Sequence, residues 1–221
     1  MCIRDRLTAI PGLMKAFITV ELSPLFVCSR VMMVRERASA TFRVVAAYSA
    51  RLCSVLPLRL ISITVFGTVL YYLAGLRTDS FVYFLIYVGF VWLTLLIDIA
   101  LGALLSAFGA SLQMVVLYQI YLGIFFFVLS GIPVNVSDMT PILSWLRFLS
   151  PFFYISQGLA QNECSGLMFG TVSGDEYLEA AGLSELSVMW CAGALMITFV
   201  GYLIIGYVGL YYSTKPRFKV L

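Results

Sequence analysis

Five arginines gathered in one short stretch are the residues of this sequence best suited to bind a partner. They lie between Cys28 and Arg51, where a single acid, Glu36, leaves a net charge of +4: Arg30, Arg35, Arg37, Arg43 and Arg51. The part from Glu36 to Tyr48 is expected to form a short helix with arginines and apolar residues along it. Such a helix either touches anionic lipid or docks a soluble domain, with Glu36 supplying a directed ion pair. The pattern leaves both alternatives open.

Two further charges, Arg59 and Asp98, stand inside long apolar runs. If residues 52–73 and 81–108 are antiparallel membrane helices, they lie roughly 10 and 15 Å from the same membrane face, because a helix rises about 1.5 Å per residue. A charge near the middle of a bilayer costs about 2.5–3.5 kcal/mol on insertion scales. We therefore expect Arg59 and Asp98 to form a buried charge pair, which serves either as a structural tie or in transport.

The residues needed for hydrolytic, metal or nucleotide chemistry are missing from the sequence. It has no histidine and no GxxxxGK[ST] loop, and its five cysteines show no CxxC spacing. A Ser/His/Asp set, a Cys/His set, a zinc site and a phosphate-binding loop are therefore not expected. We predict that this chain is not an enzyme and holds no metal. With a net charge of only +3, nucleic acid is not an expected partner.

The composition is that of a helical membrane protein. Of the 221 residues, 62% are hydrophobic and 11% are charged, and the mean hydropathy is +1.00. Soluble domains have about 25% charged residues. Membrane barrels are built from alternating segments of about 10 residues, whereas the apolar runs here reach the length of about 20 that a membrane helix needs. We predict an all-α integral membrane bundle of about five transmembrane helices.

The apolar runs and the polar intervals between them divide the chain into five regions. We expect an incomplete N-terminal region with one poor span (1–27), a cytoplasmic loop (28–51), three membrane helices (52–129), a long outer loop (130–187), and a last membrane helix with a basic tail (188–221). The three helices are predicted at 52–73, 81–108 and 112–129. Within the outer loop, 141–149 and 152–159 are apolar but too short to cross, so short re-entrant or interfacial helices are expected there.

The loop charges predict the orientation. Residues 28–51 carry +4, residues 130–187 carry −5, and the tail carries +3. Short basic loops stay in the cytoplasm, so the long acidic loop is expected outside. There Cys164 either forms an interchain disulfide or stays a free thiol. By the same logic Arg4 and Arg6 lie outside. We therefore expect either that the true N-terminal sequence is missing or that the residues MCIRDR are not native.

Three ordered motifs and one further short segment carry a family resemblance. The letters RERAS with FR, AY and LP in residues 35–57 resemble the coupling-loop signature of the G subfamily of ATP-binding cassette exporters, the White and breast-cancer-resistance-protein type. LSGIPVN at 129–135 is similar to the exit of that family's fifth helix. WLRFLSPFFY at 145–154, with NE at 162–163, is similar to its outer loop, and GDEYL at 174–178 resembles its half-transporter ending. The match runs from about residue 30 to the C-terminus.

The resemblance implies a machine larger than this chain. A nucleotide-binding domain, which holds ATP and magnesium, and a first membrane helix are expected outside this sequence, and the chain would supply membrane helices two to six with no cofactor of its own. The implied protein is a homo- or heterodimer in the plasma membrane or an internal membrane, exporting lipids, sterols or other hydrophobic compounds. The alternatives are a non-transporting scaffold or assembly protein with the same fold, and a permease that recruits a separate ATPase chain.

The resemblance also assigns roles to particular residues. Coupling to the ATPase falls to Glu36, Arg37, Arg43 and Tyr48. The fifth helix of the family lines a cavity between two protomers, which makes the cavity candidates Leu117, Ile120, Tyr121, Ile124 and Phe127, although aromatic residues in a membrane helix also serve packing or face lipid. Ile132 and Pro133 stand where the family has an upper gate of two large apolar residues. Phe153 stands where a basic residue is common, and the bridging cysteine of the family lies later than Cys164.

Overall fold

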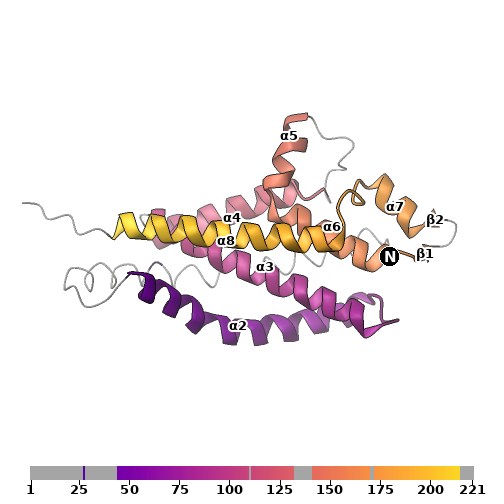
Figure 1. The fold of residues 1–221 in the computed structure, drawn as a ribbon, viewed down its shortest axis with the longest axis horizontal. Helices are drawn as coiled ribbons and strands as arrows, with labels where there is room; N and C mark the ends of the chain where they lie inside the picture. Colours follow the sequence, from indigo (N-terminus) through magenta and orange to yellow (C-terminus); the bar gives the residue numbers. More distant parts are fainter. Residues whose placement is uncertain (1–26, 28–43, 110, 132–140, 170–171, 215–221) are drawn as a thin grey trace, which may run out of the picture.

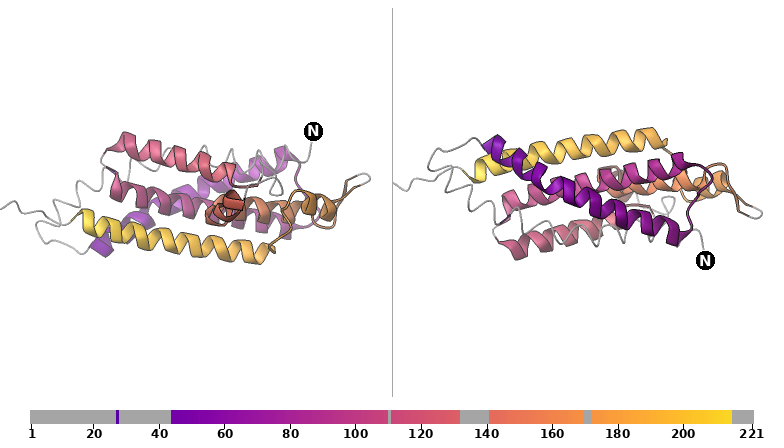
Figure 2. Two further views of the ribbon diagram at one scale, coloured as in Figure 1. Left: turned by 90° about the horizontal axis from the view of Figure 1, so that it is seen from above. Right: turned by 90° about the horizontal axis from the view of Figure 1, so that it is seen from below.

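The described residues form four long helices, which run side by side along the length of the molecule (Figure 1). The computed structural model describes residues 27, 44–109, 111–131, 141–169 and 172–214. The long helices are α2 (Val44–Ala74), α3 (Phe81–Phe108), α4 (Leu112–Val128) and α8 (Val188–Ser213). Figure 2 shows α3 between α4 and α8, with α2 crossing it on a third side.

Short elements fill the interval between α4 and α8. In chain order they are α5 (Pro141–Leu146), the 3₁₀ turn η2 (Arg147–Leu149), α6 (Pro151–Cys164), the antiparallel pair β1 (Met168–Phe169) and β2 (Val172–Ser173), and α7 (Gly174–Ala180). α5 projects from the side of the bundle, and α7 lies at one end of it (Figure 1). We call this the α7 end, which the loop charges predict to be outside, and the opposite end the Val44 end.

Serine caps begin several of these helices. The hydroxyls of Ser80, Ser111 and Ser173 accept hydrogen bonds from backbone amides in the first turns of α3, α4 and α7. Each bond satisfies one of the amide groups that a helix start leaves without a partner. α7 also carries Asp175 and Glu176 in its first turn, where negative charge favours the helix dipole.

The core is built around α3, which packs against α2, α4, α6 and α8. In the most apolar 18-residue stretch of each helix, 56% of the residues are buried in α3, against 11% in α2 and in α8. α2 and α8 therefore turn most of their apolar surface away from the bundle.

Two glycines permit close approach between helices. A Cβ on Gly158 of α6 would lie 2.3 Å from the ring of Phe90, and one on Gly206 of α8 would lie 3.2 Å from the backbone of Leu104.

The predicted fold class is confirmed. Three of the described helices, α2, α3 and α8, are long and apolar enough to cross a membrane, and the 17-residue α4 is a shorter apolar helix beside them. The α3 bounds coincide with the predicted span 81–108, and α5 with η2 covers 141–149. α6 is longer than the predicted 152–159. The division of the chain into five regions stays a prediction, and most of the first region, with its poor span at 7–27, lies outside the described residues.

One boundary differs from the sequence-based expectation. α2 begins at Val44 within the described residues, eight positions before the predicted span at residue 52, and continues through residue 51 without a break. Charged side chains such as Arg51 place a segment relative to the membrane, but they do not end a helix, since arginine is a good helix former. α2 also contains Pro57, which cannot donate a helical hydrogen bond, and it is visibly curved (Figure 1).

Candidate functional site

α4 has one buried face and one open face. Val115, Gln119, Gly123 and Phe126 are buried, at the spacing of three to four residues that lines one side of a helix. The cavity candidates take the other side. Their exposed fractions are 46% for Leu117, 39% for Ile120, 66% for Tyr121 and 58% for Ile124, and Phe127 is half-buried. Four of the five candidates thus share an apolar surface that the described part of the chain leaves open.

The α7 end of α4 is held by two serines of the following segment. Ser150 donates its hydroxyl hydrogen to the carbonyl oxygen of Phe126 at 2.9 Å, and Ser156 donates to that of Ser130 at 2.8 Å. The ring of Phe127 meets that of Phe152 edge-on, with centroids 6.5 Å apart. Free carbonyls at a helix end need such donors, so the start of α6 sits directly on the end of α4.

Gly131 turns the chain away from α4. Its φ is +81°, a left-handed conformation that glycine adopts without steric cost. The Ser-Gly pair of the LSGIPVN motif therefore has a physical reason. The predicted gate residues that follow it, Ile132 and Pro133, lie outside the described residues.

Of the four predicted coupling residues, the structure places only Tyr48. Glu36, Arg37 and Arg43 lie outside the described residues. Tyr48 is 9% exposed, its ring lies 6.2 Å from that of Tyr207, and its hydroxyl donates over 3.5 Å to the carbonyl oxygen of Leu203. Tyr48 therefore contacts α8 inside the bundle. Its role in coupling stays a prediction.

The two predicted buried charges lie on helices that pack against each other. Arg59 is half-buried on α2, and Asp98 is 2% exposed on α3. Both side chains are thus withdrawn from the surroundings of the bundle, as a charge in an apolar environment requires. Their pairing stays a prediction.

The position of Cys164 does not suit a bond to a second chain. Its thiol is free and fully buried among Ala160, Leu178 and Leu183, beneath α7. Burial, with a smaller contribution from the charge of Glu163, raises the pKa of Cys164 to about 11, so the reactive thiolate is scarce at neutral pH. A second chain would have to displace α7 to reach this sulfur, because α7 covers it.

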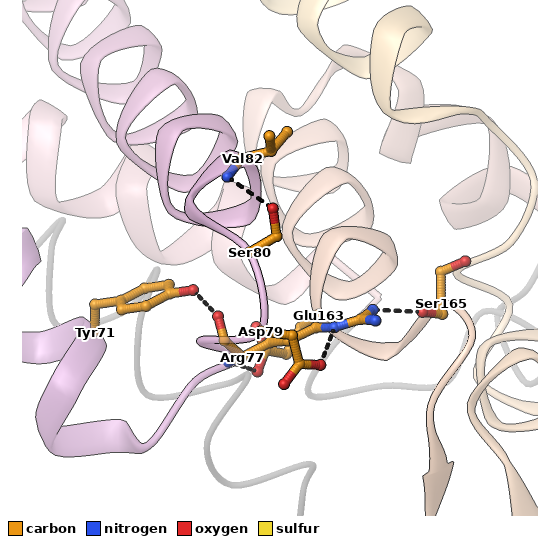
Figure 3. Close-up of polar contacts among 7 residues, drawn as sticks. All are labelled: Tyr71, Arg77, Asp79, Ser80, Val82, Glu163 and Ser165. Atoms are coloured by element: carbon orange, nitrogen blue, oxygen red, sulfur yellow. Dashed lines mark hydrogen bonds and ion pairs between the residues drawn. The ribbon is translucent and has the colours of Figure 1, made fainter.

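A polar cluster at the α7 end joins the α2–α3 turn to the end of α6 (Figure 3). The backbone N–H of Arg77 donates to Glu163 Oε1 at 2.6 Å, and its guanidinium donates to the carbonyl oxygen of Ser165 at 2.8 Å and pairs with Asp79 at 3.0 Å. The Tyr71 hydroxyl donates to the carbonyl oxygen of Arg77. The sequence showed Glu163 only as part of a motif, and nothing in it pointed to a partner 86 positions away.

Two more contacts extend these ties. Asn162 donates to the carbonyl oxygen of Tyr83 at 3.1 Å, so both residues of the Asn-Glu motif hold α6 to the region around the start of α3. Arg147 of η2 forms an ion pair with Glu185, before α8, at 2.8 Å. The sequence shows Arg147 as a loop charge within the WLRFLSPFFY motif and Glu185 as a loop charge, and it does not indicate that they pair.

Comparison with known proteins decides the family. The sequence model described as ABC-2 type transporter matches residues 9–164, which is most of the chain. The chain therefore belongs to the ABC-2 type transporter family. Membership accounts for the apolar helices and gives this ABC-2 type transporter chain a membrane location and a role in transport.

Curated relatives confirm the resemblance to the G subfamily. This ABC-2 type transporter chain is 29% identical over 186 residues to the broad substrate specificity ATP-binding cassette transporter ABCG2 of Sus scrofa, covering 77% of the chain. It is 27% identical to the ABC multidrug transporter atrI of Aspergillus fumigatus and 24% identical to protein scarlet of Drosophila melanogaster, over 72% and 78% of the chain. The chain spans only 28%, 13% and 28% of the lengths of these three relatives.

Proposed function

We propose that this chain is the transmembrane domain of an ATP-driven exporter of lipids, sterols or other hydrophobic small molecules. The observation that carries the proposal is the open apolar face of α4, which has no charged residue along its 17 positions. An uncharged aromatic and aliphatic surface desolvates apolar compounds without leaving a buried charge unpaired. Two such faces, one from each half-transporter of a homo- or heterodimer, would enclose the pathway.

The energy for export is proposed to come from a nucleotide-binding domain elsewhere in the protein or on a separate chain. ATP and magnesium would bind there, and this chain would hold neither. The basic block at 28–51 is the proposed docking element, with Glu36, Arg37 and Arg43 in contact with that domain. α2 supports this assignment, because it runs without a break from residue 44 into the bundle and therefore transmits a push on its first turns directly.

The closing test is substitution on the open face of α4. Tyr121→Ala in the full-length protein should reduce export of hydrophobic fluorescent compounds from cells about tenfold, since an aromatic contact of this kind contributes about 0.5–1.5 kcal/mol beyond the burial of its area. Initial rates at several compound concentrations would show the loss chiefly as weaker apparent affinity.

Tyr212→Ala is the matched control. Tyr212 on α8 is 68% exposed, nearly the same as Tyr121 at 66%, and it lies away from α4. Equal export by wild type and both variants for every compound tested would overturn the assignment of the α4 face. Absence of ATP-dependent export in a correctly inserted full-length protein would favour the non-transporting scaffold instead.

A further inference from the structure

The segment that covers the α7 end of α4 contains a buried guanidinium. Arg147 lies in η2, three residues before Ser150, whose hydroxyl bonds to the Phe126 carbonyl at the end of α4. Only 6% of Arg147 is exposed. A compound that leaves along the open face of α4 would therefore meet this segment next.

Among the described residues, most of the hydrogen-bonding capacity of this guanidinium is unused. Nη2 donates to both carboxylate oxygens of Glu185, at 2.9 and 2.8 Å. Nε and Nη1 are buried, and neither has an acceptor within the part of the chain that the structure describes. A buried donor without an acceptor is costly. The site can therefore accept an oxygen that the described residues do not supply.

Two phenyl rings that contact each other edge-on lie against the guanidinium. Its Cζ lies 4.8 Å from the ring centroid of Phe148 and 5.1 Å from that of Phe153. Phe153 is fully buried, whereas Phe148 is 45% exposed. The exposed Phe148 side chain can therefore move away from the guanidinium, whereas the buried Phe153 side chain is held in place by its neighbours.

The charge balance selects the kind of acceptor. Glu185 already neutralises Arg147, so a second anion would leave an excess negative charge in an apolar pocket, at a high cost. A neutral hydroxyl or carbonyl oxygen uses the free donors without that cost. The two neighbouring rings beside the guanidinium suit an apolar body attached to such an oxygen.

We propose that Arg147 is a binding site for the hydroxyl or carbonyl oxygen of a neutral, otherwise hydrophobic compound, which displaces Phe148 and accepts hydrogen bonds from Nε and Nη1. This site rests on the proposed export function and narrows its substrates to compounds with a neutral oxygen acceptor. The same acceptor chemistry occurs in the ester carbonyls of membrane phospholipids, so both an exported compound and a resident lipid fit the site.

Photolabelling of the full-length protein in proteoliposomes tests the site without requiring transport. The probes are a long-chain alcohol with a diazirine beside its hydroxyl end and the matching alkane with the same diazirine. Mass spectrometry should find the alcohol attached within 141–164 about tenfold more than the alkane, because hydrogen bonds to a charged group are the stronger kind. Labelling of the two probes in equal amounts, or no labelling of this segment, would overturn the proposal.

Arg147→Lys is the decisive variant, because lysine keeps the positive charge beside Glu185 and removes the donor nitrogens Nε and Nη1. The preference for the alcohol should fall to near parity. Arg77→Lys is the control, since the Arg77 guanidinium is already bonded to Asp79 and Ser165, and it should leave the preference unchanged. A preference retained in Arg147→Lys contradicts the site. If Arg147→Lys does not fold, the test rests on the wild-type protein: a preference for the alcohol over the alkane within 141–164 supports the site, and its absence contradicts it.

Two further arms separate the sources and the hypotheses. In ether-linked phospholipids, which lack ester carbonyls, increased labelling by the alcohol supports the site and shows that bilayer lipids share it, while unchanged labelling assigns the site to the exported compound. Export that continues without a labelling preference removes the Arg147 site and leaves the proposed function intact. A labelling preference without ATP-dependent export supports the Arg147 site and contradicts the proposed export function.

Discussion

The two ends of the bundle are held together by different kinds of contact. At the α7 end, charged and amide side chains join segments far apart in the sequence: Arg77 to Glu163, Asn162 to the Tyr83 backbone, Arg147 to Glu185, and Gln161 to the Leu183 backbone. At the Val44 end, the described contact between α2 and α8 is aromatic packing of Tyr48 on Tyr207 with a hydrogen bond of 3.5 Å.

This difference indicates where the bundle can move. Short hydrogen bonds and ion pairs have one preferred geometry and weaken steeply when their atoms shift, whereas packed apolar side chains tolerate small sliding movements between helices. The α7 end should therefore move as one block, and the Val44 end should allow α2 to shift against α8. Under the proposed function, the force from ATP hydrolysis enters at the end that is free to respond.

The largest effect is expected where α6 lies closest to α3. Gly158→Leu should lower the free energy of unfolding by about 3 kcal/mol or more, because even a Cβ would lie 2.3 Å from the Phe90 ring and overpacking of a core is costly. Thermal unfolding of the full-length protein, followed by fluorescence-detected size-exclusion chromatography, measures the change.

Gly193→Leu on α8 provides the comparison, since nothing lies within 4 Å of a Cβ placed there. Its melting temperature should match or exceed that of wild type. If Gly158→Leu had the same melting temperature as Gly193→Leu, the α7 end would not be the rigid block that its contacts indicate.

A smaller effect is expected from the link between the α2–α3 turn and α6. Glu163→Ala removes the charged acceptor of the partly buried backbone N–H of Arg77, and such a loss should cost about 1 kcal/mol. The melting temperature should fall accordingly. Glu179→Ala on the exposed side of α7 should change stability by less than about 0.5 kcal/mol, and equal melting of the two variants would show that the Glu163 bond contributes nothing.

The sequence predicted individual helices better than the contacts between them. α3 was placed at 81–108 because its apolar run is bounded by Ser80, which caps it, and by a Gly-Ala-Ser turn. For α2, the sequence predicts a short helix at 36–48 and a separate span from residue 52, whereas the structure has one unbroken helix through residues 44–52. Charge determines the side of the membrane and leaves the backbone free to stay helical.

In the candidate site, too, positions along a helix were predictable and contacts between distant segments were not. Family resemblance placed the cavity candidates on α4, and the structure finds Leu117 and Tyr121 on its open face. Hydropathy alone gives no such face, because α4 is apolar on all sides. The pairs Arg77 with Glu163 and Arg147 with Glu185 join residues 86 and 38 positions apart, and neither local pattern nor composition specifies contacts at such separations.

The smallest effect is expected at the Val44 end, from removal of one hydroxyl. Tyr48→Phe deletes a hydrogen bond whose length of 3.5 Å is beyond the usual range for an O–H donor, so the free energy of unfolding should change by less than about 0.5 kcal/mol. The ring keeps its contact with Tyr207. Thermal unfolding of the purified full-length protein is again the measurement.

Tyr87→Phe makes the comparison between the two ends direct. The Tyr87 hydroxyl is buried and donates to the carbonyl oxygen of Gly67 at 3.2 Å, so its removal should cost about 1 kcal/mol, the usual net contribution of one hydrogen bond. The two substitutions are chemically identical, and any difference between them reflects the surroundings alone. A Tyr48→Phe variant as unstable as Tyr87→Phe would mean that the Val44 end is also fastened by hydrogen bonds, and α2 would then have no freedom to slide against α8.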